Sequence, residues 1–292
     1  MEKYRGTGVA MITPFTDNLE VDFEALKKLT EHLVSNGINY LVVMGTTGEN
    51  PTISDFEQQR ILETVQTTNE NRIPVVFGIA GNNTKSVVER MKSFDYTGVS
   101  AILSASPYYN KPNQAGLVDH YTQLADASKA PIILYNVPGR TGSMMALDTI
   151  LKLAEHPNII AIKEASGNLD HCMKLIRQKP AEFLVISGDD NFTLPYIAAG
   201  MVGVISVIGN AYPKEFSQMV RYALENNFEN ARYLHYRLLP LMNAIFDDGN
   251  PGGIKAVLKN MGICNDFMRA PLHPVLPEVE DKLKTLMAKY KA

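Results

Sequence analysis

The sequence predicts an α/β fold, a (β/α)8 barrel of the TIM type with a C-terminal helical extension. Eight short runs rich in β-branched and other apolar residues recur at intervals of roughly 20 to 35 residues. The runs are almost continuously hydrophobic, as in parallel strands that are covered on both faces. Amphipathic segments separate them, which is the pattern of repeated βα units. The eight runs cover residues 7–13, 39–45, 74–80, 99–106, 131–137, 158–165, 183–188 and 203–207.

Two of the amphipathic segments carry clear signals for the start of a helix. The first, residues 22–37, has Asp22 as its expected N-cap and Gly37 as its expected C-cap. The second begins with Ser54 as N-cap and has Glu57 three residues later, the spacing of a capping box.

The strand pattern stops after residue 211, and the rest of the chain has helical patterns. We therefore expect a catalytic barrel over residues 1–224 and a helical domain over residues 225–292. A doubly wound nucleotide-binding fold should show GxGxxG after its first strand, but the sequence there is TPFTDN, residues 13–18.

Composition narrows the possible partners and compartments. The 292 residues carry a net charge of −3, which does not favour nucleic acid or a membrane surface as partner. The N-terminal residues form no long apolar run of the signal-peptide type, and no run is long enough to span a membrane. Cys172 and Cys264 lie far apart, without the spacing of a metal site. We expect a cytoplasmic protein that needs no metal ion.

Polar, hydroxyl and glycine-rich segments follow several of the predicted strands. In barrels of this type the chemistry takes place at the C-terminal ends of the strands, so these segments are expected to share one rim. They are GTTGEN at 45–50, SPYYN at 106–110, YNVPGRTG at 135–142, KEASG at 163–167 and SGDDN at 187–191.

The sixth run, NIIAIKEA, contains a lysine at the end of a buried strand. Burying an ammonium group costs several kcal/mol unless it is paired or loses its proton. Lys163 could therefore form an ion pair with Glu164 or another acid, or it could serve as a neutral amine nucleophile. Tyr135 on the preceding strand would lie roughly 5 Å away, close enough to move protons for such an amine.

Asp189 and Asp190 follow the seventh run as a pair. Adjacent residues seldom place two ligands on one ion, and no histidine is near them in the sequence. We expect them to be structural and predict no metal site.

Together these motifs resemble the pyruvate-dependent class I aldolases, and most of all the dihydrodipicolinate synthase family. GTTGE at 45–49, YNVPGRTG at 135–142 and IKEASG at 162–167 carry the resemblance, which extends over nearly the whole chain. Further matches are the opening GVAMITPF, SPYYNKP at 106–112, SGDD at 187–190, GVISV at 203–207 and GNPGGIK at 249–255.

The resemblance implies that the chain condenses pyruvate with L-aspartate 4-semialdehyde to 4-hydroxy-tetrahydrodipicolinate, in lysine and diaminopimelate biosynthesis. Lys163 would form a Schiff base with pyruvate, and Tyr135 would shuttle protons. Thr46 would connect Tyr135 to a second tyrosine, Tyr109, that reaches in from a neighbouring subunit. No cofactor is expected, because the lysine itself supplies the electron sink.

The resemblance also implies a set of residues that bind the substrates. Thr47 would hold the pyruvate carboxylate. Arg140 would bind the carboxylate of the semialdehyde, a role that suits its planar fork of donors. Gly188 and the carbonyl of Ile205 would line the pocket.

Assembly and regulation are further expectations from the resemblance. The family suggests a homotetramer built as a dimer of dimers. Members that lysine inhibits usually have two histidines and a glutamate at positions that here hold Asp55, Gln58 and Ser86, although Asn82 and Tyr108 do match. We predict weak or absent inhibition by lysine.

Two other functions compete with this one. A related pyruvate lyase, such as N-acetylneuraminate lyase or a keto-deoxy-sugar-acid aldolase, would share the lysine and tyrosine. Arg140, Tyr109 and the double threonine favour the synthase. A non-catalytic barrel that binds a small molecule would be expected to have lost Lys163 or Tyr135, and the sequence retains both.

Overall fold

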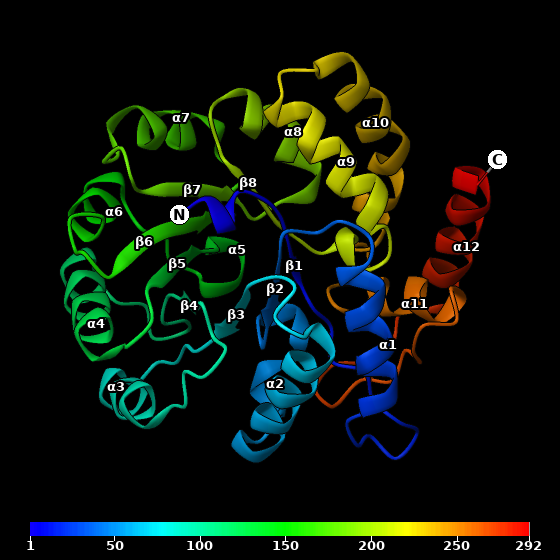
Figure 1. Cartoon of the computed structure of the whole chain (residues 1–292), viewed down its shortest axis with the longest axis horizontal. Helices are drawn as coiled ribbons and strands as arrows, with labels where there is room; N and C mark the ends of the chain where they lie inside the picture. The colour runs from blue at the N-terminus through cyan, green and yellow to red at the C-terminus, as the bar shows by residue number, and fades with distance from the viewer. Residues whose placement is uncertain (292) are drawn as a thin grey trace.

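Eight parallel strands close into a barrel in chain order, which confirms the predicted fold class. The computed structural model describes residues 1–291 and is shown in Figure 1. The strands are β1 (Gly6–Ala10), β2 (Tyr40–Val43), β3 (Val75–Gly78), β4 (Ala101–Ala105), β5 (Ile132–Asn136), β6 (Ile159–Glu164), β7 (Leu184–Ser187) and β8 (Gly203–Ser206).

Helices surround the barrel, and a further group of helices extends from one side of it (Figure 1). Those that follow the strands are α1 (Phe23–Val34), α2 (Asp55–Asn69), α3 (Thr84–Ser93), α4 (Gln114–Ala127), α5 (Pro138–Thr141), α6 (Leu147–Leu153), α7 (Leu169–Gln178), α8 (Thr193–Ala198) and α9 (Pro213–Leu224). The extension consists of α10 (Phe228–Ala244), α11 (Gly252–Asn260) and α12 (Pro277–Lys291). Short 3-10 helices are η1 (Glu2–Tyr4), η2 (Thr46–Gly48), η3 (Asn50–Thr52), η4 (Asp190–Phe192) and η5 (Ile208–Asn210).

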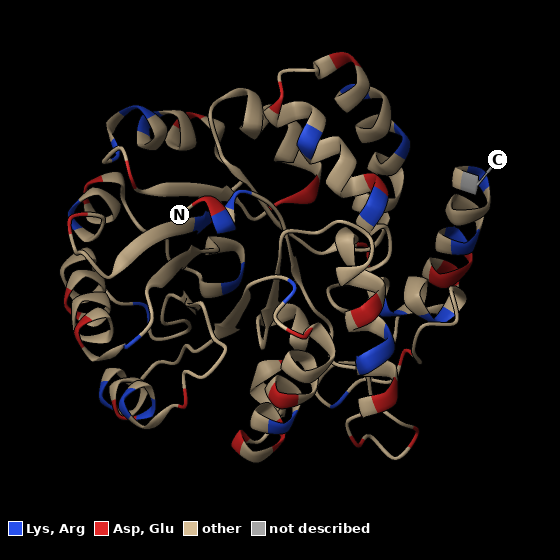
Figure 2. Ribbon diagram, viewed as in Figure 1, with Lys and Arg blue, Asp and Glu red and all other residues tan. Residues whose placement is uncertain are grey.

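The alternation of side chains along the strands creates two apolar cores. One fills the barrel and includes Tyr40, Val42 and Ile133, while Tyr4 of η1 belongs to the same cluster. The other lies between the barrel and its helices, as expected when parallel strands are buried on both faces. Charged residues of both signs are interspersed over the outer helices (Figure 2).

The local start signals are confirmed, and one stop signal is wrong. The side chain of Asp22 accepts a hydrogen bond from the Ala25 amide, and Ser54 and Glu57 form the complete capping box. The expected C-cap at Gly37 is wrong, because α1 already ends at Val34. Two backbone bonds close the helix there, and Gly37, with φ of 84°, serves the turn that leads into β2.

The extension packs closely on the barrel. Helix α10 lies against α9 and α12, and α11 packs on α12. Within the described residues, no helix combines the length and the apolar character needed to cross a bilayer.

Candidate active site

Lys163 and Tyr135 lie side by side inside the barrel. They occupy paired positions in the register of β5 and β6, and both face inward, since Ala161 and Ile133, two residues earlier, belong to the interior core. Lys163 is only 4% exposed and Tyr135 only 7% exposed. The ammonium nitrogen of Lys163 lies 4.3 Å from the centre of the tyrosine ring. The predicted proximity of the two side chains is confirmed.

The structure separates Lys163 from its neighbour Glu164. Successive strand residues face opposite sides, so Glu164 points out of the barrel, where its carboxylate accepts hydrogen bonds from Asn136 Nδ2 and the Ser166 amide, both at 2.9 Å. His171 Nε2 lies 3.7 Å from the same carboxylate. Within residues 1–291, no carboxylate oxygen lies within 4.0 Å of the Lys163 nitrogen. The structural reading of Lys163, in which it pairs with Glu164, is therefore not supported.

Gly188 leaves space for the Lys163 side chain. A Cβ atom at this position would lie 3.1 Å from Lys163 Cε and 2.6 Å from the Cβ of Ala165. Ile205 is fully buried on β8 and belongs to the interior core. Both predicted lining residues thus lie at the ends of strands that contribute to the same interior.

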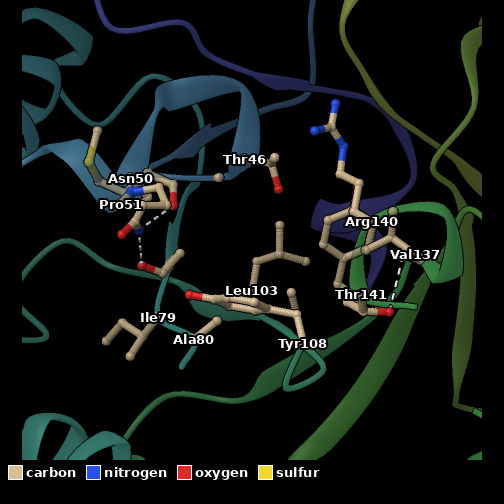
Figure 3. A pocket seen from close by; sticks show the side chains of 15 residues that line it. Thr46, Asn50, Pro51, Ile79, Ala80, Leu103, Tyr108, Val137, Arg140 and Thr141 are labelled. Atoms are coloured by element: carbon tan, nitrogen blue, oxygen red, sulfur yellow. Dashed lines mark hydrogen bonds between the residues drawn. The ribbon is translucent and has the colours of Figure 1, made fainter. Parts of the chain in front are cut away.

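A cavity of about 450 Å³ opens at the C-terminal ends of the strands. Thr46, Tyr135 and Arg140 line it, so the structure brings three of the eight predicted site residues to the same cavity (Figure 3). Tyr108 also lines it, whereas Tyr109 does not.

The loop that carries the double threonine is tightly constrained. A Cβ atom at Gly78 would lie 2.0 Å from the carbonyl oxygen of Met44, so only glycine permits β3 to approach the loop this closely. Asn50 closes the loop by donating to that same oxygen at 2.8 Å. Thr46 lines the cavity, while Thr47 does not line it and is only 3% exposed.

Tyr109 points away from the rest of the chain. It is 91% exposed and has φ of 64°, an uncommon backbone conformation for a tyrosine. The preceding residue, Tyr108, is fixed by a reciprocal pair of hydrogen bonds with Asn82, at 2.8 and 2.9 Å.

The two aspartates after β7 have different environments. Asp190 is buried and accepts hydrogen bonds from the Val207 and Ile208 amides, a structural role as predicted. Asp189 lines a second cavity of about 390 Å³. Burial raises the pKa of Asp189 to about 6, and the positive charge of Lys163 opposes that rise. Across residues 1–291, no three histidine, cysteine or acidic side chains gather as metal ligands do.

Sequence reasoning missed two residues of the extension that touch this site. Asn250 contacts Thr47, and Lys255 contacts Glu49, although more than two hundred positions separate the partners in each pair. The sequence signals were an asparagine and a lysine in GNPGGIK, where the lysine stands within an otherwise apolar helical face.

Comparison with known proteins identifies the family. The model of the "Dihydrodipicolinate synthetase family" matches residues 3–290. The chain belongs to this family. The resemblance inferred from the barrel-rim motifs is thereby confirmed.

Relatives within the dihydrodipicolinate synthetase family share close to half of the residues. The chain is 49% identical over 284 residues to the 4-hydroxy-tetrahydrodipicolinate synthase of Flavobacterium psychrophilum, covering 97% of each chain. It is also 49% identical to the enzyme of that name from Parabacteroides distasonis, covering 97% of this chain and 96% of the other. The crystal structure of dihydrodipicolinate synthase from Aquifex aeolicus superimposes with a TM-score of 0.95 at 40% identity, over 99% of this chain and 98% of that one.

Proposed function

We propose that the chain is a lyase that condenses pyruvate with L-aspartate 4-semialdehyde to form 4-hydroxy-tetrahydrodipicolinate, a step in lysine and diaminopimelate biosynthesis. The relatives named above carry the name of this activity. The alternatives, a sugar-acid lyase or a non-catalytic barrel, have no observation in their favour.

The observation that carries the proposal is the environment of Lys163. Lys163 is buried, has no carboxylate oxygen within 4.0 Å among residues 1–291, and packs against the phenol of Tyr135, so a nucleophilic amine and an acid–base group stand together. Ile186, which pairs with Lys163 in the register of β6 and β7, belongs to the same apolar interior.

In the first half-reaction the Lys163 nitrogen attacks the ketone carbon of pyruvate. Tyr135 protonates the oxygen, which leaves as water when the imine forms. The protonated imine withdraws electrons from the methyl group, which loses a proton to give an enamine. Thr46 connects Tyr135 to Tyr109 of a neighbouring subunit, so that protons can be exchanged with solvent.

In the second half-reaction the enamine carbon attacks the aldehyde carbon of the semialdehyde, and the aldehyde oxygen takes up a proton. The amino group of the semialdehyde then adds to the imine carbon and displaces Lys163, which closes the ring. Thr47 binds the pyruvate carboxylate, and Arg140 binds the carboxylate of the semialdehyde through its fork of N–H donors. Gly188 and Ile205 shape the space around the imine.

This proposal includes an assembly. Tyr109 is exposed in the single chain, so its catalytic role requires a partner subunit that places the ring over a neighbouring site. We propose a homotetramer built as a dimer of dimers, located in the cytoplasm. We also propose that catalysis uses no metal ion or organic cofactor, since the imine supplies the electron sink.

Trapping of the imine tests the function. The protein is incubated with pyruvate, reduced with borohydride, digested and analysed by mass spectrometry. We expect one reduced pyruvate adduct per chain, on the peptide that contains Lys163. A Lys163→Ala variant, confirmed to be folded by circular dichroism, is the control and should carry no adduct.

The second substrate is tested by comparing aldehydes. L-aspartate 4-semialdehyde should be consumed much faster than N-acetylmannosamine or a glyceraldehyde. Active, folded protein that forms no adduct on Lys163, or that prefers a sugar aldehyde, would refute the proposed function.

A further inference from the structure

We propose that Asn250, from the C-terminal extension, is a positioning residue that orients the Thr47 hydroxyl as a hydrogen-bond donor toward the carboxylate of the 2-oxo acid. The inference deepens the proposed function and rests on it. It assigns the extension a part in selecting a substrate with a carboxylate.

The contact itself is direct. Asn250 Nδ2 donates a hydrogen bond to Thr47 Oγ1 at 3.1 Å, although the residues lie 203 positions apart. Thr47 is 3% exposed, so water does not compete freely for its hydroxyl. Asn250 Oδ1 is itself buried and has no partner among residues 1–291.

The direction of this bond determines what Thr47 can do next. A hydroxyl has one hydrogen to donate and two lone pairs that accept. Because Thr47 Oγ1 accepts from Asn250, its own hydrogen remains available and points elsewhere. A carboxylate can only accept hydrogen bonds, so a hydroxyl held in this way is the partner that it requires.

The extension is anchored so that it can hold this geometry. Gly253 lets the start of α11 pack directly on the backbone of Ile245, since a Cβ atom there would lie 2.2 Å from the Ile245 carbonyl oxygen. Two residues further along α11, Lys255 forms a fully buried ion pair with Glu49, which belongs to the same loop as Thr47. The loop is therefore fixed to the extension at two points.

Two variants of Asn250 distinguish a positioning role from a structural one. Asn250→Asp has nearly the same shape but can no longer donate, so Thr47 would donate to the new carboxylate and turn away from the substrate. Its negative charge would also repel the substrate carboxylate. Asn250→Ala removes the contact and leaves the hydroxyl free to rotate. Asn260→Asp, an exposed position on the same extension, is the matched control.

The measurement is the pyruvate concentration that gives half-maximal borohydride trapping, together with KM for pyruvate and kcat. We expect Asn250→Asp to raise both concentrations by about 10- to 100-fold, the range for loss of a hydrogen bond to a charged group. Asn250→Ala should raise them by several-fold, and Asn260→Asp should leave them unchanged. Loss of folded protein alone would lower kcat without changing KM.

Acidic conditions supply a second readout. Protonation of the carboxyl introduced at position 250 restores a donor, so the ratio of the variant's KM to the wild-type KM should fall as the pH is lowered. If Asn250→Asp binds pyruvate as tightly as the wild type, Thr47 donates to Asn250 and the inference is wrong. Wild-type protein that forms no imine would refute the proposed function, and this inference with it.

Discussion

The buried ion pair between Lys255 and Glu49 joins the extension to the barrel, and its contribution to stability can be measured. Both side chains are 0% exposed, and Lys255 also donates to the Phe267 carbonyl oxygen at 2.8 Å. Its ammonium group lies 4.3 Å from the centre of the Phe15 ring. Lys255→Met would remove the cation and leave Glu49 buried, with the Arg269 amide at 3.3 Å as its remaining donor.

We expect this single change to lower the free energy of unfolding by about 3–5 kcal/mol, the usual cost of leaving one charge of a buried pair alone. The double variant Glu49→Gln/Lys255→Met removes both charges and should recover part of this loss, because a neutral amide costs less to bury. A recovery of about 1–3 kcal/mol would match the desolvation penalty that one unsatisfied group imposes.

Urea unfolding followed by far-UV circular dichroism measures these differences, at one fixed protein concentration because assembly also stabilises the chain. Lys259→Met is the matched control on the same helix, since Lys259 pairs with Asp266 at 2.8 Å but its side chain is 42% exposed. Exposed pairs contribute about 0–1 kcal/mol, so this variant should resemble the wild type. If Lys255→Met is no less stable than Lys259→Met, or the double variant is less stable than Lys255→Met, the reasoning is wrong.

Three further predictions concern the active site and its regulation. Gly188→Ala would place a methyl group 3.1 Å from Lys163 Cε and 2.6 Å from the Cβ of Ala165. It should abolish imine trapping, while the protein is destabilised by about 1–3 kcal/mol and still folds. Normal trapping by this variant would contradict the prediction. The folded-state pKa of Asp189, about 6, lies above the value of 3.8 for an unperturbed aspartate, so its contribution to stability is present at acid pH and is lost as the pH rises through about 6. Asp189→Asn should therefore raise the melting temperature above that of the wild type by more at alkaline pH than at acid pH. An equal difference in melting temperature at both pH values would contradict the claim that burial raises the pKa of Asp189. Free lysine, titrated while the initial rate is measured, should inhibit weakly or not at all. Strong inhibition at sub-millimolar lysine would show that Asp55, Gln58 and Ser86 do not prevent lysine from inhibiting the enzyme.

The barrel could be predicted from sequence because its strands are buried on both faces and read as distinct apolar runs. The predicted ends were less accurate, as the first strand shows. Its apolar run continues through Met11 and Ile12, yet the strand ends at Ala10; the Met11 amide still donates to the Val42 carbonyl oxygen, and the Ile12 amide turns to the Asn210 side chain. Both residues are still buried, 2% and 1% exposed, because they belong to the core between the barrel and its helices. Hydrophobicity reports burial, and burial continues past the point where the backbone leaves the sheet.

The pairing of Lys163 with Tyr135 was predictable for a related reason. Both stand at the ends of adjacent parallel strands, and strand order follows chain order in this barrel, so neighbouring strands in sequence are neighbours in space. The contact between Asn250 and Thr47 has no such rule behind it. It depends on how three helices outside the repeat fold back on the rim, which no periodicity in the sequence specifies.

The extension reaches the loop of the double threonine from a second side as well. Arg269 donates to both carboxylate oxygens of Glu57 and to the carbonyl oxygen of Thr52 at 2.8 Å. This fork holds the pKa of Glu57 at about 2, and Glu57 also completes the capping box that begins α2. Residues after position 224 therefore fix both ends of the segment between β2 and α2. All eight strands of the barrel come from residues 6–206, but the loop with Thr47 at the rim is held in place by the extension.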